Sequence, residues 1–512
     1  MPSTAELSLE RPLGQVAGKQ RLPIKRAYVE SLGILLFTLL AFLVMGYHPG
    51  LEDDGVYLTA VKADLNPSLF PHDSEFFRLQ LQASFFDGWI AHFVKWTGIP
   101  LAWAELFWQF AALFLILWVA RRIAGQLFPG RPAQWAAVAM VAAMFTLPVA
   151  GTALNIADQH LHPRNLATAL ILAAVSRILE GKRWQALPLL ALAFLLHPIM
   201  AAFGISFCVC EALVLARPAG FRLRAVEGSL VAAAPLGWIF APASPAWRQA
   251  LNTRSYFFLY RWSWYEWLGA LAPLFLFWVL WRVANRRGET RLADFSLAVF
   301  AYGIFQQLVA MVMLTPDALA RLAPLQPMRY LQLVYIFMAL AAGGLLGRFL
   351  LKASAWRWAI YLLVFNGGMF LVQWELIDEG AHLELPSTVS ANPWLQAFAW
   401  IRQNTPDGAY FALDPQYLSA PGEGFHSFRA LAERSQLSDG DKDAAVATQV
   451  PSLARTWQRQ QLAQAGWASF QLAEFERLKT EFGVDWVLVS YPAPPGLGCR
   501  WHNGALAVCQ IP

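Results

Sequence analysis

A series of long apolar runs, separated by short polar segments, constrains the fold of this chain more than any other feature. A helix of roughly 17 to 25 apolar residues can cross a lipid bilayer. The runs lie at residues 28–46, 101–120, 133–150, 165–180, 186–216, 226–242, 266–283, 292–314, 329–347 and 357–375. Only 14% of the residues are charged, whereas a typical soluble domain is about 25% charged. The pattern predicts an α-helical polytopic membrane protein.

The run 186–216 is too long for one ordinary span, and His197 and Pro198 interrupt it. Proline removes a backbone hydrogen-bond donor and clashes with the preceding helical turn. We therefore expect two short helices that meet at this break, which brings the prediction to about eleven membrane segments.

Basic residues predict the orientation of these segments. The tail 1–27 is polar and basic, which places the N-terminus in the cytoplasm. The basic tracts that fall on the same side are Arg121-Arg122, Lys182-Arg183, Arg217 to Arg224, Arg286-Arg287 and Arg348 to Arg357. The loops that fall on the opposite side are 48–100, 151–164, 243–265 and 315–328. The net charge of +5 follows from this topology and indicates no nucleic-acid partner.

Two segments near the N-terminus need separate interpretation. The stretch 84–98 carries Asp87, His92 and Lys95, so it fits an amphipathic helix at the membrane interface better than a span. The first apolar run is followed by no small-residue cleavage pattern, so we expect an uncleaved first span.

The composition changes after residue 375. The segment 376–512 is polar and mixed and has no long apolar run. It contains strand candidates within 409–413 and 482–490 and a helical stretch over 456–482. The predicted division is a cytoplasmic tail 1–27, a membrane domain 28–375 whose first outer loop is 48–100, and a small extracytoplasmic α/β domain 376–512.

Two cysteines near the C-terminus, Cys499 and Cys509, leave two interpretations open. A disulfide between them would close a small loop on the oxidising outer side, because disulfides persist in oxidising compartments. The alternative is two free thiols.

Polar residues collect at the outer ends of the predicted spans. Polar groups near a membrane interior are costly unless they are paired or hydrated, so their clustering on one face needs a reason. The candidate site residues come from five stretches far apart in sequence and are Glu52, Asp53, Asp54, Asp158, His160, His162, Arg164, His197, Arg254, Arg261 and Arg329. Each stretch alone has a simpler interpretation, such as a solvated acidic loop, histidines that cap helices, or an arginine that extends to lipid headgroups. One shared pocket would explain all the stretches together.

The residue types suit one chemistry. A carboxylate can act as a general base toward an acceptor hydroxyl or bind a divalent cation. Arginine can hold a phosphate through paired charged hydrogen bonds, and histidine can bind a metal ion or a phosphate oxygen. Together with the aromatic residues of 256–267, these groups indicate transfer of a group from a lipid phosphate.

An acidic pair just after the first span, an interfacial first outer loop, about eleven spans and an outer C-terminal domain resemble the GT-C superfamily of integral-membrane glycosyltransferases. The stretches LEDDGVYLTAVKADLNPSLFPHDSEFF, NIADQHLHPRNLA, LLHPIMA and FRALAERSQLSDGDKDAA are also similar to an uncharacterised group of bacterial membrane proteins with a C-terminal domain of unknown function. The GT-C resemblance implies an enzyme of the bacterial inner membrane and cell envelope. Such an enzyme transfers a sugar from a polyprenyl-phosphate-linked donor to a lipid, glycan or protein acceptor at the outer face of the membrane.

The resemblance also implies roles for particular residues. The catalytic carboxylate of GT-C enzymes corresponds to Asp53 or Asp54, and the sequence does not choose between them. Arginines at the outer ends of spans contact the lipid phosphate in that family, which makes Arg329 and Arg164 candidates. The second acidic motif of metal-dependent members has no clear counterpart around Asp158, so the need for a divalent cation stays open.

Two other functions fit the same pattern. Charged residues near spans often mark a transport pathway, so a transporter or flippase of a lipid-linked or anionic substrate is one alternative, although no internal repeat of the kind common in transporters is evident. A noncatalytic GT-C-fold protein that binds lipid and presents its outer domain to a protein partner is the other.

In the C-terminal segment, one polar cluster is either a surface loop or part of the substrate site. Its members are His426, Arg429, Arg434, Asp439 and Asp441.

Overall fold

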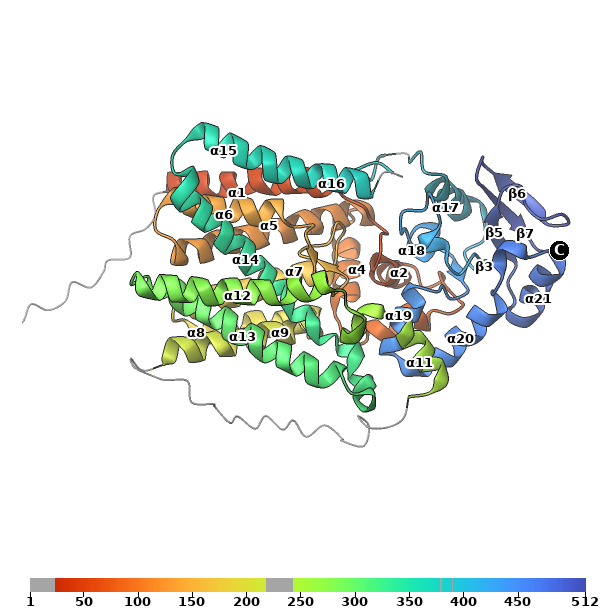
Figure 1. Ribbon diagram of the computed structural model, residues 1–512. Coiled ribbons are helices and arrows are strands. Elements are labelled where there is room, and N and C mark those ends of the chain that lie inside the picture. The colour runs from red at the N-terminus through yellow and green to blue at the C-terminus, as the bar shows by residue number, and fades with distance from the viewer. Residues whose placement is uncertain (1–23, 218–242, 378–379, 389) are drawn as a thin grey trace, which may run out of the picture.

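The computed structural model of the chain describes residues 24–217, 243–377, 380–388 and 390–512. Figure 1 shows a bundle of long helices at one end of the molecule and a domain with a β-sheet at the other. The predicted span 226–242 and most of the predicted tail 1–27 lie outside the described residues.

Seven helical stretches of the described part of the chain are long and apolar enough to cross a membrane. They are Ala27–Met45 within α1 (Ile24–Met45), Leu101–Leu127 (α5), Pro198–Ala216 (α9), Trp264–Arg286 (α12), Thr290–Leu314 (α13), the stretch Ala318–Leu351 that contains α14 (Leu331–Leu346), and the stretch Ala355–Leu376 that contains α15 (Ala355–Leu362) and α16 (Gly368–Leu376). By length and hydropathy the chain is a polytopic membrane protein.

The described residues do not reach the expected number of about eleven spans. Three of the predicted spans are shorter helices, namely α6 (Arg131–Ala143), α7 (Pro163–Leu179) and α8 (Arg183–Leu196). The 14 residues of α8 extend about 21 Å at ~1.5 Å per residue, less than the ~30 Å hydrocarbon core of a bilayer. The helix predicted over 133–150 ends early because β1 (Pro148–Val149) pairs with β2 (Leu154–Asn155) in a short hairpin.

The predicted break at His197 is confirmed. α8 ends at Leu196, and α9 begins at Pro198, whose missing N–H is tolerated in the first turn of a helix. The Nδ1 atom of His197 accepts a hydrogen bond from the backbone N–H of Met200 at 3.4 Å. The His197 side chain therefore caps α9 at the junction of the two helices.

Glycines bring two helices of the bundle into close contact. A Cβ atom on Gly343 of α14 would lie 2.3 Å from the carbonyl oxygen of Ala136 on α6. A Cβ atom on Gly347 would lie 2.6 Å from the Cβ of Ala136. Small residues four positions apart let helix backbones approach closely in membranes. The close contact between α6 and α14 therefore depends on glycine, which has no side chain, at positions 343 and 347.

The C-terminal domain contains a mixed five-stranded sheet in the order β4-β3-β5-β7-β6. The strands are β3 (Tyr410–Ala412), β4 (Ser435–Gln436), β5 (Trp486–Ser490), β6 (Gly498–His502) and β7 (Leu506–Gln510). β3 runs parallel to β4 and β5, and β7 runs antiparallel to β5 and β6. Trp486 and Leu488 belong to one hydrophobic core, and Val487 and Val489 belong to another, because successive side chains of a strand point to opposite faces.

The predictions for this domain are right for β3 and β5 and wrong for a single helix over 456–482. That stretch forms α20 (Ala454–Ala463) and α21 (Leu472–Phe482). Between them Gly466 has φ +81°, a left-handed conformation that glycine adopts without strain.

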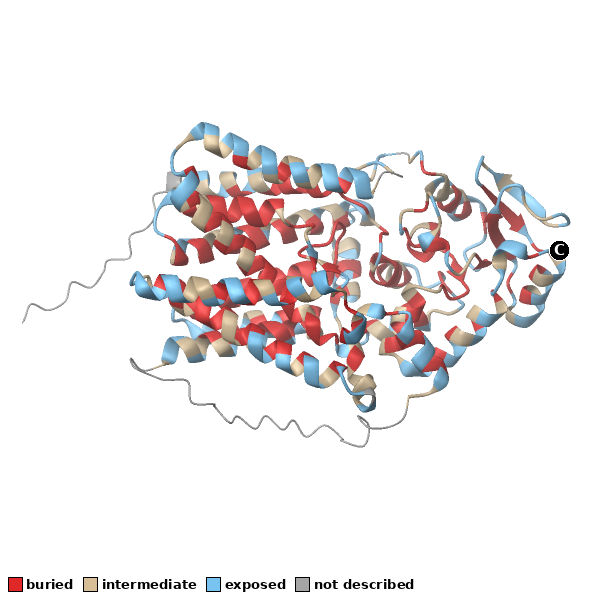
Figure 2. Cartoon of the chain, in the orientation of Figure 1, coloured by how far each residue is buried: buried red, intermediate tan, exposed pale blue. Residues whose placement is uncertain are grey.

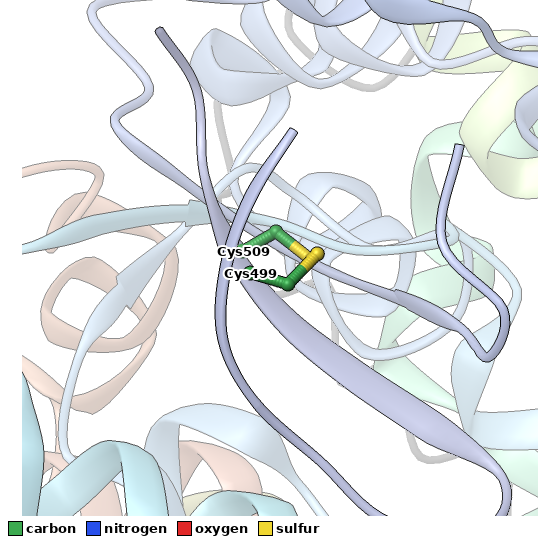
Figure 3. Close-up of a disulfide and its surroundings, with 2 residues drawn as sticks. All are labelled: Cys499 and Cys509. Atoms are coloured by element: carbon green, nitrogen blue, oxygen red, sulfur yellow. A yellow bond between two sulfur atoms is a disulfide. The ribbon is translucent and has the colours of Figure 1, made fainter. Parts of the chain in front are cut away.

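Figure 3 shows that Cys499 and Cys509 form a disulfide between the paired strands β6 and β7, so the alternative of two free thiols is wrong.

The loop after α1 joins the bundle to the C-terminal domain. Tyr47 forms a β-bridge with Leu383, and Leu51 forms one with His426. Residues of α19 (Lys442–Gln449) and α20 belong to the same hydrophobic core as the long helices. Figure 2 shows that buried segments continue across this junction. The C-terminal domain is therefore packed onto one end of the bundle.

We expect Gly343→Ala to destabilise the bundle, because its Cβ would collide with the α6 backbone. Overpacking of this kind typically costs about 1–3 kcal/mol, so the thermal midpoint of the detergent-purified protein should fall. Gly368→Ala on α16 is the matched control, since nothing lies within 4 Å of a Cβ added there. Equal midpoints for the two variants would contradict the close packing of α6 and α14.

Candidate functional site

A cavity of about 1270 Å³ lies between one end of the helical bundle and the C-terminal domain. Its walls come from α2 (Asp54–Leu65), the β1–β2 hairpin, the α8–α9 junction, the turn Pro327–Tyr330 and α19. The predicted site residues that line it are Glu52, Asp53, Asp158, His160, His162, Arg164, His197, Arg254 and Arg329. The five stretches that the sequence analysis placed on one face thus meet in one cavity. Asp54 and Arg261 do not line it.

The structure separates the two acids that the sequence left equivalent. Asp53 precedes α2, lines the cavity and has 39% of its side chain exposed. Asp54 is 1% exposed, and its Oδ2 accepts a hydrogen bond from the backbone N–H of Gly50 at 2.6 Å. Burial raises the pKa of the Asp54 carboxyl. Asp54 therefore stabilises the turn that carries Asp53, and only Asp53 of the two reaches the cavity.

Lys442, at the start of α19, forms an ion pair with Asp53. Its Nζ lies 3.1 Å from Asp53 Oδ1 and also contacts the carboxylate of Glu52. Burial disfavours the charged form of Asp53, but Lys442, His162 and Arg164 together outweigh this effect and hold the pKa of Asp53 well below its usual range. Asp53 is therefore an anion at neutral pH. Sequence reasoning missed Lys442, because it lies 389 residues from Asp53 and no local pattern connects them.

His162 is held in one tautomer at the N-terminus of α7. Its Nδ1 accepts a hydrogen bond from the backbone N–H of Arg164 at 2.9 Å, so the neutral ring carries its proton on Nε2. Nε2 lies 3.7 Å from Asp53 Oδ2, beyond direct hydrogen-bonding distance. Burial and the charge of Arg164 lower the pKa of His162 to about 4. The ring is therefore neutral at pH 7 and directs its N–H toward Asp53.

Arg164 and Asp158 form a buried bidentate ion pair. Arg164 Nε donates to Asp158 Oδ2 at 3.1 Å, and a second guanidinium nitrogen contacts Oδ1. Burial alone would raise the pKa of Asp158, but the charge and hydrogen bond of Arg164, together with His162 and His160, outweigh burial and the pKa is about 2. The pair fixes the loop that carries His160 and His162.

Arg329 lines the cavity and has no carboxylate partner in the described part of the chain. It lies in the turn Pro327–Tyr330 at the start of α14. Among the residues that the structure describes, no carboxylate lies within ion-pair distance of Arg329, and its buried Nε has no hydrogen-bond partner. Arg164 and Arg254, by contrast, are paired with Asp158 and Asp441. Arg329 is therefore available to an anion in the cavity.

Two further histidines face the cavity. Neither ring nitrogen of buried His160 has a hydrogen-bond partner in the described part of the chain. Because Nδ1 of His197 accepts from Met200, the neutral ring carries its proton on Nε2. The ring centroids of His197 and His162 lie 6.0 Å apart. Burial lowers the pKa of His197 well below its usual value, so its ring supplies a neutral hydrogen-bond donor next to the charged groups.

Arg261 lies outside the cavity on the exposed surface. One of its guanidinium nitrogens donates to Asn252 Oδ1 at 3.1 Å, and the guanidinium stacks over the Phe258 ring at 4.6 Å. Tyr260 and Trp264 beside it are 68% and 76% exposed. Tyr260, Arg261 and Trp264 therefore fit an aromatic belt at the helix ends.

One side of the cavity consists of residues that also face outward from the bundle. Tyr265 on α12 is 61% exposed, and Val372 and Leu376 on α16 are 46% and 67% exposed. All three line the cavity. The polar site is thus continuous with apolar helix surface.

The polar cluster of the C-terminal segment is not a surface loop. The buried members are His426, Arg429, Arg434 and Asp439. Arg429 forms a bidentate pair with Asp443 at 2.7 and 2.9 Å. Asp441 lines the cavity and pairs with Arg254. Most members of the cluster are therefore buried within the C-terminal domain and stabilise it. Asp441 belongs to the cavity.

One group of side chains that could bind a metal ion lies outside the cavity. Within the described residues, the one group of three metal-type ligands whose atoms lie within 4.8 Å of one another is His48, Glu384 and His426. None of these residues lines the cavity. In the cavity, the charges of Asp53 and Asp158 are balanced by Lys442 and Arg164.

No protein-family model matches this chain, and no curated protein matches it either. The chain is a multi-span helical protein with a C-terminal α/β domain. Its GT-C resemblance is therefore a hypothesis that rests on the architecture and on the residues of the cavity.

We expect Asp158→Asn to destabilise the protein, because the buried Arg164 charge would lose its carboxylate. Removing one partner of a buried ion pair typically costs about 3–5 kcal/mol, which a thermal midpoint at pH 7 will register. The native pKa of about 2 lies below the unfolded value of ~3.9. The stabilisation is therefore present above about pH 4 and is lost as the pH falls toward 2.

Asp407→Asn is the control for that measurement. Its carboxylate is 54% exposed and lies 3.5 Å from Arg434, and exposed pairs contribute only about 0–1 kcal/mol. A midpoint for D158N as high as that for D407N would contradict the structural role of the Asp158–Arg164 pair.

Proposed function

We propose that this chain is a GT-C-type glycosyltransferase of the bacterial inner membrane. It transfers a sugar from a polyprenyl-phosphate-linked donor to a lipid, glycan or protein acceptor at the outer face of the membrane. The observation that carries the proposal is a single cavity that combines an ionised acid, Asp53, with Arg329, an arginine that has no carboxylate partner among the described residues.

The donor phosphate binds at Arg329. A guanidinium without a carboxylate partner attracts a phosphate through short, charge-assisted hydrogen bonds, and low dielectric strengthens them. His197, in the same cavity wall, presents its Nε2–H as a neutral donor. The prenyl chain leaves the cavity past Val372 and Leu376, where the lining residues are also exposed apolar surface.

The acceptor hydroxyl binds at Asp53. The carboxylate takes the hydroxyl proton as the acceptor oxygen attacks the anomeric carbon of the donor sugar. The new carbon–oxygen bond forms while the bond between sugar and phosphate breaks, and the electron pair stays on the polyprenyl phosphate beside Arg329. Because the low pKa of Asp53 makes it a weak base, the proton moves late, when the sugar has gained oxocarbenium character.

The cavity and the C-terminal domain lie on the extracytoplasmic side in this proposal. The Cys499–Cys509 disulfide supports an extracytoplasmic position of the C-terminal domain, since disulfides persist in oxidising compartments. Basic residues support it as well. Arg122, Arg177 and Lys182 gather around Glu180, at the opposite end of α7 from the cavity, as the positive-inside rule expects of a cytoplasmic end.

We expect Asp53→Asn to lower kcat by about 10²–10⁴-fold, the usual contribution of a general base. The measurement is transfer of labelled sugar from polyprenyl-phosphate donors by the purified protein in nanodiscs. Asp54→Asn should lower the thermal midpoint and change kcat much less than Asp53→Asn does, because Asp54 supports the turn and does not line the cavity. Full turnover by D53N would remove Asp53 from the mechanism. A wild-type protein that turns over no such donor would favour the transporter or the noncatalytic lipid-binding protein.

We expect Arg329→Ala to weaken donor binding by about 10–100-fold, because a hydrogen bond to a charged group contributes roughly 1.5–3 kcal/mol. The measurement is the dissociation constant of polyprenyl phosphate for the purified protein. Arg261→Ala removes an arginine outside the cavity and should bind the lipid as wild type does. Equal affinities of R329A and wild type would contradict the assignment of the phosphate to Arg329.

A further inference from the structure

A cluster outside the cavity brings together two histidines and one carboxylate. Nδ1 of His48 lies 3.3 Å from Oε1 of Glu384, and Nε2 of His426 lies 3.1 Å from each carboxylate oxygen of Glu384. The side chains of His48, His426 and Glu384 are 0%, 1% and 11% exposed. The proposed sugar transfer uses none of the three.

The hydrogen bonds of His426 require a positive charge inside this cluster. Nδ1 of His426 lies 3.1 Å from the carbonyl oxygen of Glu423, which can only accept, so Nδ1 carries a proton. In the neutral ring, Nε2 then presents a lone pair to the oxygen lone pairs of Glu384. Two such groups repel each other at 3.1 Å unless a cation lies between them. That cation is either a proton, carried by Nε2 or by the carboxylate of Glu384, or a metal ion bound by both groups.

The distances and the donor types fit a metal ion. Zn²⁺ binds imidazole nitrogen and carboxylate oxygen at about 2.0–2.2 Å, so neighbouring ligands of a tetrahedral site stand about 3.3 Å apart. The observed separations are 3.1 and 3.3 Å. Imidazole donors favour Zn²⁺ over Mg²⁺ and Ca²⁺. A backbone carbonyl on the second ring nitrogen, as Glu423 provides for His426, is the usual support of a metal-bound histidine.

The three residues come from three segments that the backbone already aligns. His48 follows α1, Glu384 lies between α16 and the C-terminal domain, and His426 precedes α18 (Phe428–Ala432). The N–H of Glu384 donates to the carbonyl of Tyr47 at 2.8 Å. Gly46 has φ +83°, and a Cβ there would lie 2.8 Å from Nε2 of His48. Glycine at that position leaves the space that the His48 ring occupies.

We propose that His48, Glu384 and His426 bind one Zn²⁺ ion as its three protein ligands, with water in the fourth position of the tetrahedron. The ion clamps the loop that carries Asp53 between the end of α1 and the C-terminal domain. Because the ligands do not line the cavity, the ion acts by positioning the loop, and this inference holds whether or not the chain transfers sugars.

The test uses the full-length protein in nanodiscs, stripped of metal with a chelator and then titrated with Zn²⁺. We expect stoichiometric binding of Zn²⁺ and a rise in the thermal midpoint. Co²⁺ in its place should give the visible absorption of a tetrahedral site. His48→Ala and His426→Ala should lose both effects. His502→Ala, which removes an exposed histidine at the end of β6, is the matched control and should keep them.

Glu384→Gln tests the site if the histidine variants fail to fold, because glutamine keeps the shape and an acceptor oxygen but not the charged ligand. We expect it to bind Zn²⁺ at least ~10-fold more weakly than wild type, the lower end of what a disturbed metal site loses. Equal Zn²⁺ binding by E384Q and wild type would overturn the proposal. So would a folded, metal-free wild type that binds no Zn²⁺ at micromolar concentration, and either result would assign the cluster to a proton shared between His426 and Glu384.

Discussion

Backbone hydrogen bonds on both edges of the segment 46–52 determine where the candidate site forms. On one edge the N–H of Tyr47 donates to the carbonyl of His382 at 3.1 Å, and on the other the N–H of Glu52 donates to the carbonyl of Phe425 at 3.0 Å. The segment, which follows α1 of the bundle, is therefore held on both edges by residues of the C-terminal part of the chain. Asp53 follows it directly, and its position against Lys442 depends on both edges being occupied. The C-terminal domain is for this reason a part of the site and not an appended module.

Charge compensation gives the cavity its chemical character. Most of its carboxylates are matched by cations from other elements, as in the pairs Asp158–Arg164 and Asp441–Arg254. Such pairs keep buried charges tolerable, because an unpaired charge in a low-dielectric site is costly. Arg329 departs from this pattern among the described residues. An arginine held at the end of a membrane helix without a carboxylate is retained at a cost that a bound anion would offset.

The sequence was sufficient where local patterns decide the structure. Apolar runs predict the long helices, the His197-Pro198 pair predicts the break before α9, and the short apolar run within 482–490 predicts β5. The meeting of five stretches at one end of the bundle also followed, because spans that alternate direction bring alternate loops to the same face. Sequence patterns failed where the structure depends on one specific hydrogen bond or hairpin, or on a contact between distant segments. The choice of Asp53 over Asp54 depends on the N–H of Gly50, and the early end of α6 depends on the β1–β2 hairpin. No local signal indicates that Lys442 meets Asp53 or that His48, Glu384 and His426 converge.

The central claim is that the cavity holds a lipid phosphate opposite Asp53. An electron cryo-microscopy structure of the protein in nanodiscs with added polyprenyl phosphate tests it most directly. The account predicts density for the phosphate within hydrogen-bonding distance of Arg329 and for the prenyl chain along Val372 and Leu376. A cavity without that density, at lipid concentrations that saturate binding, would contradict the account.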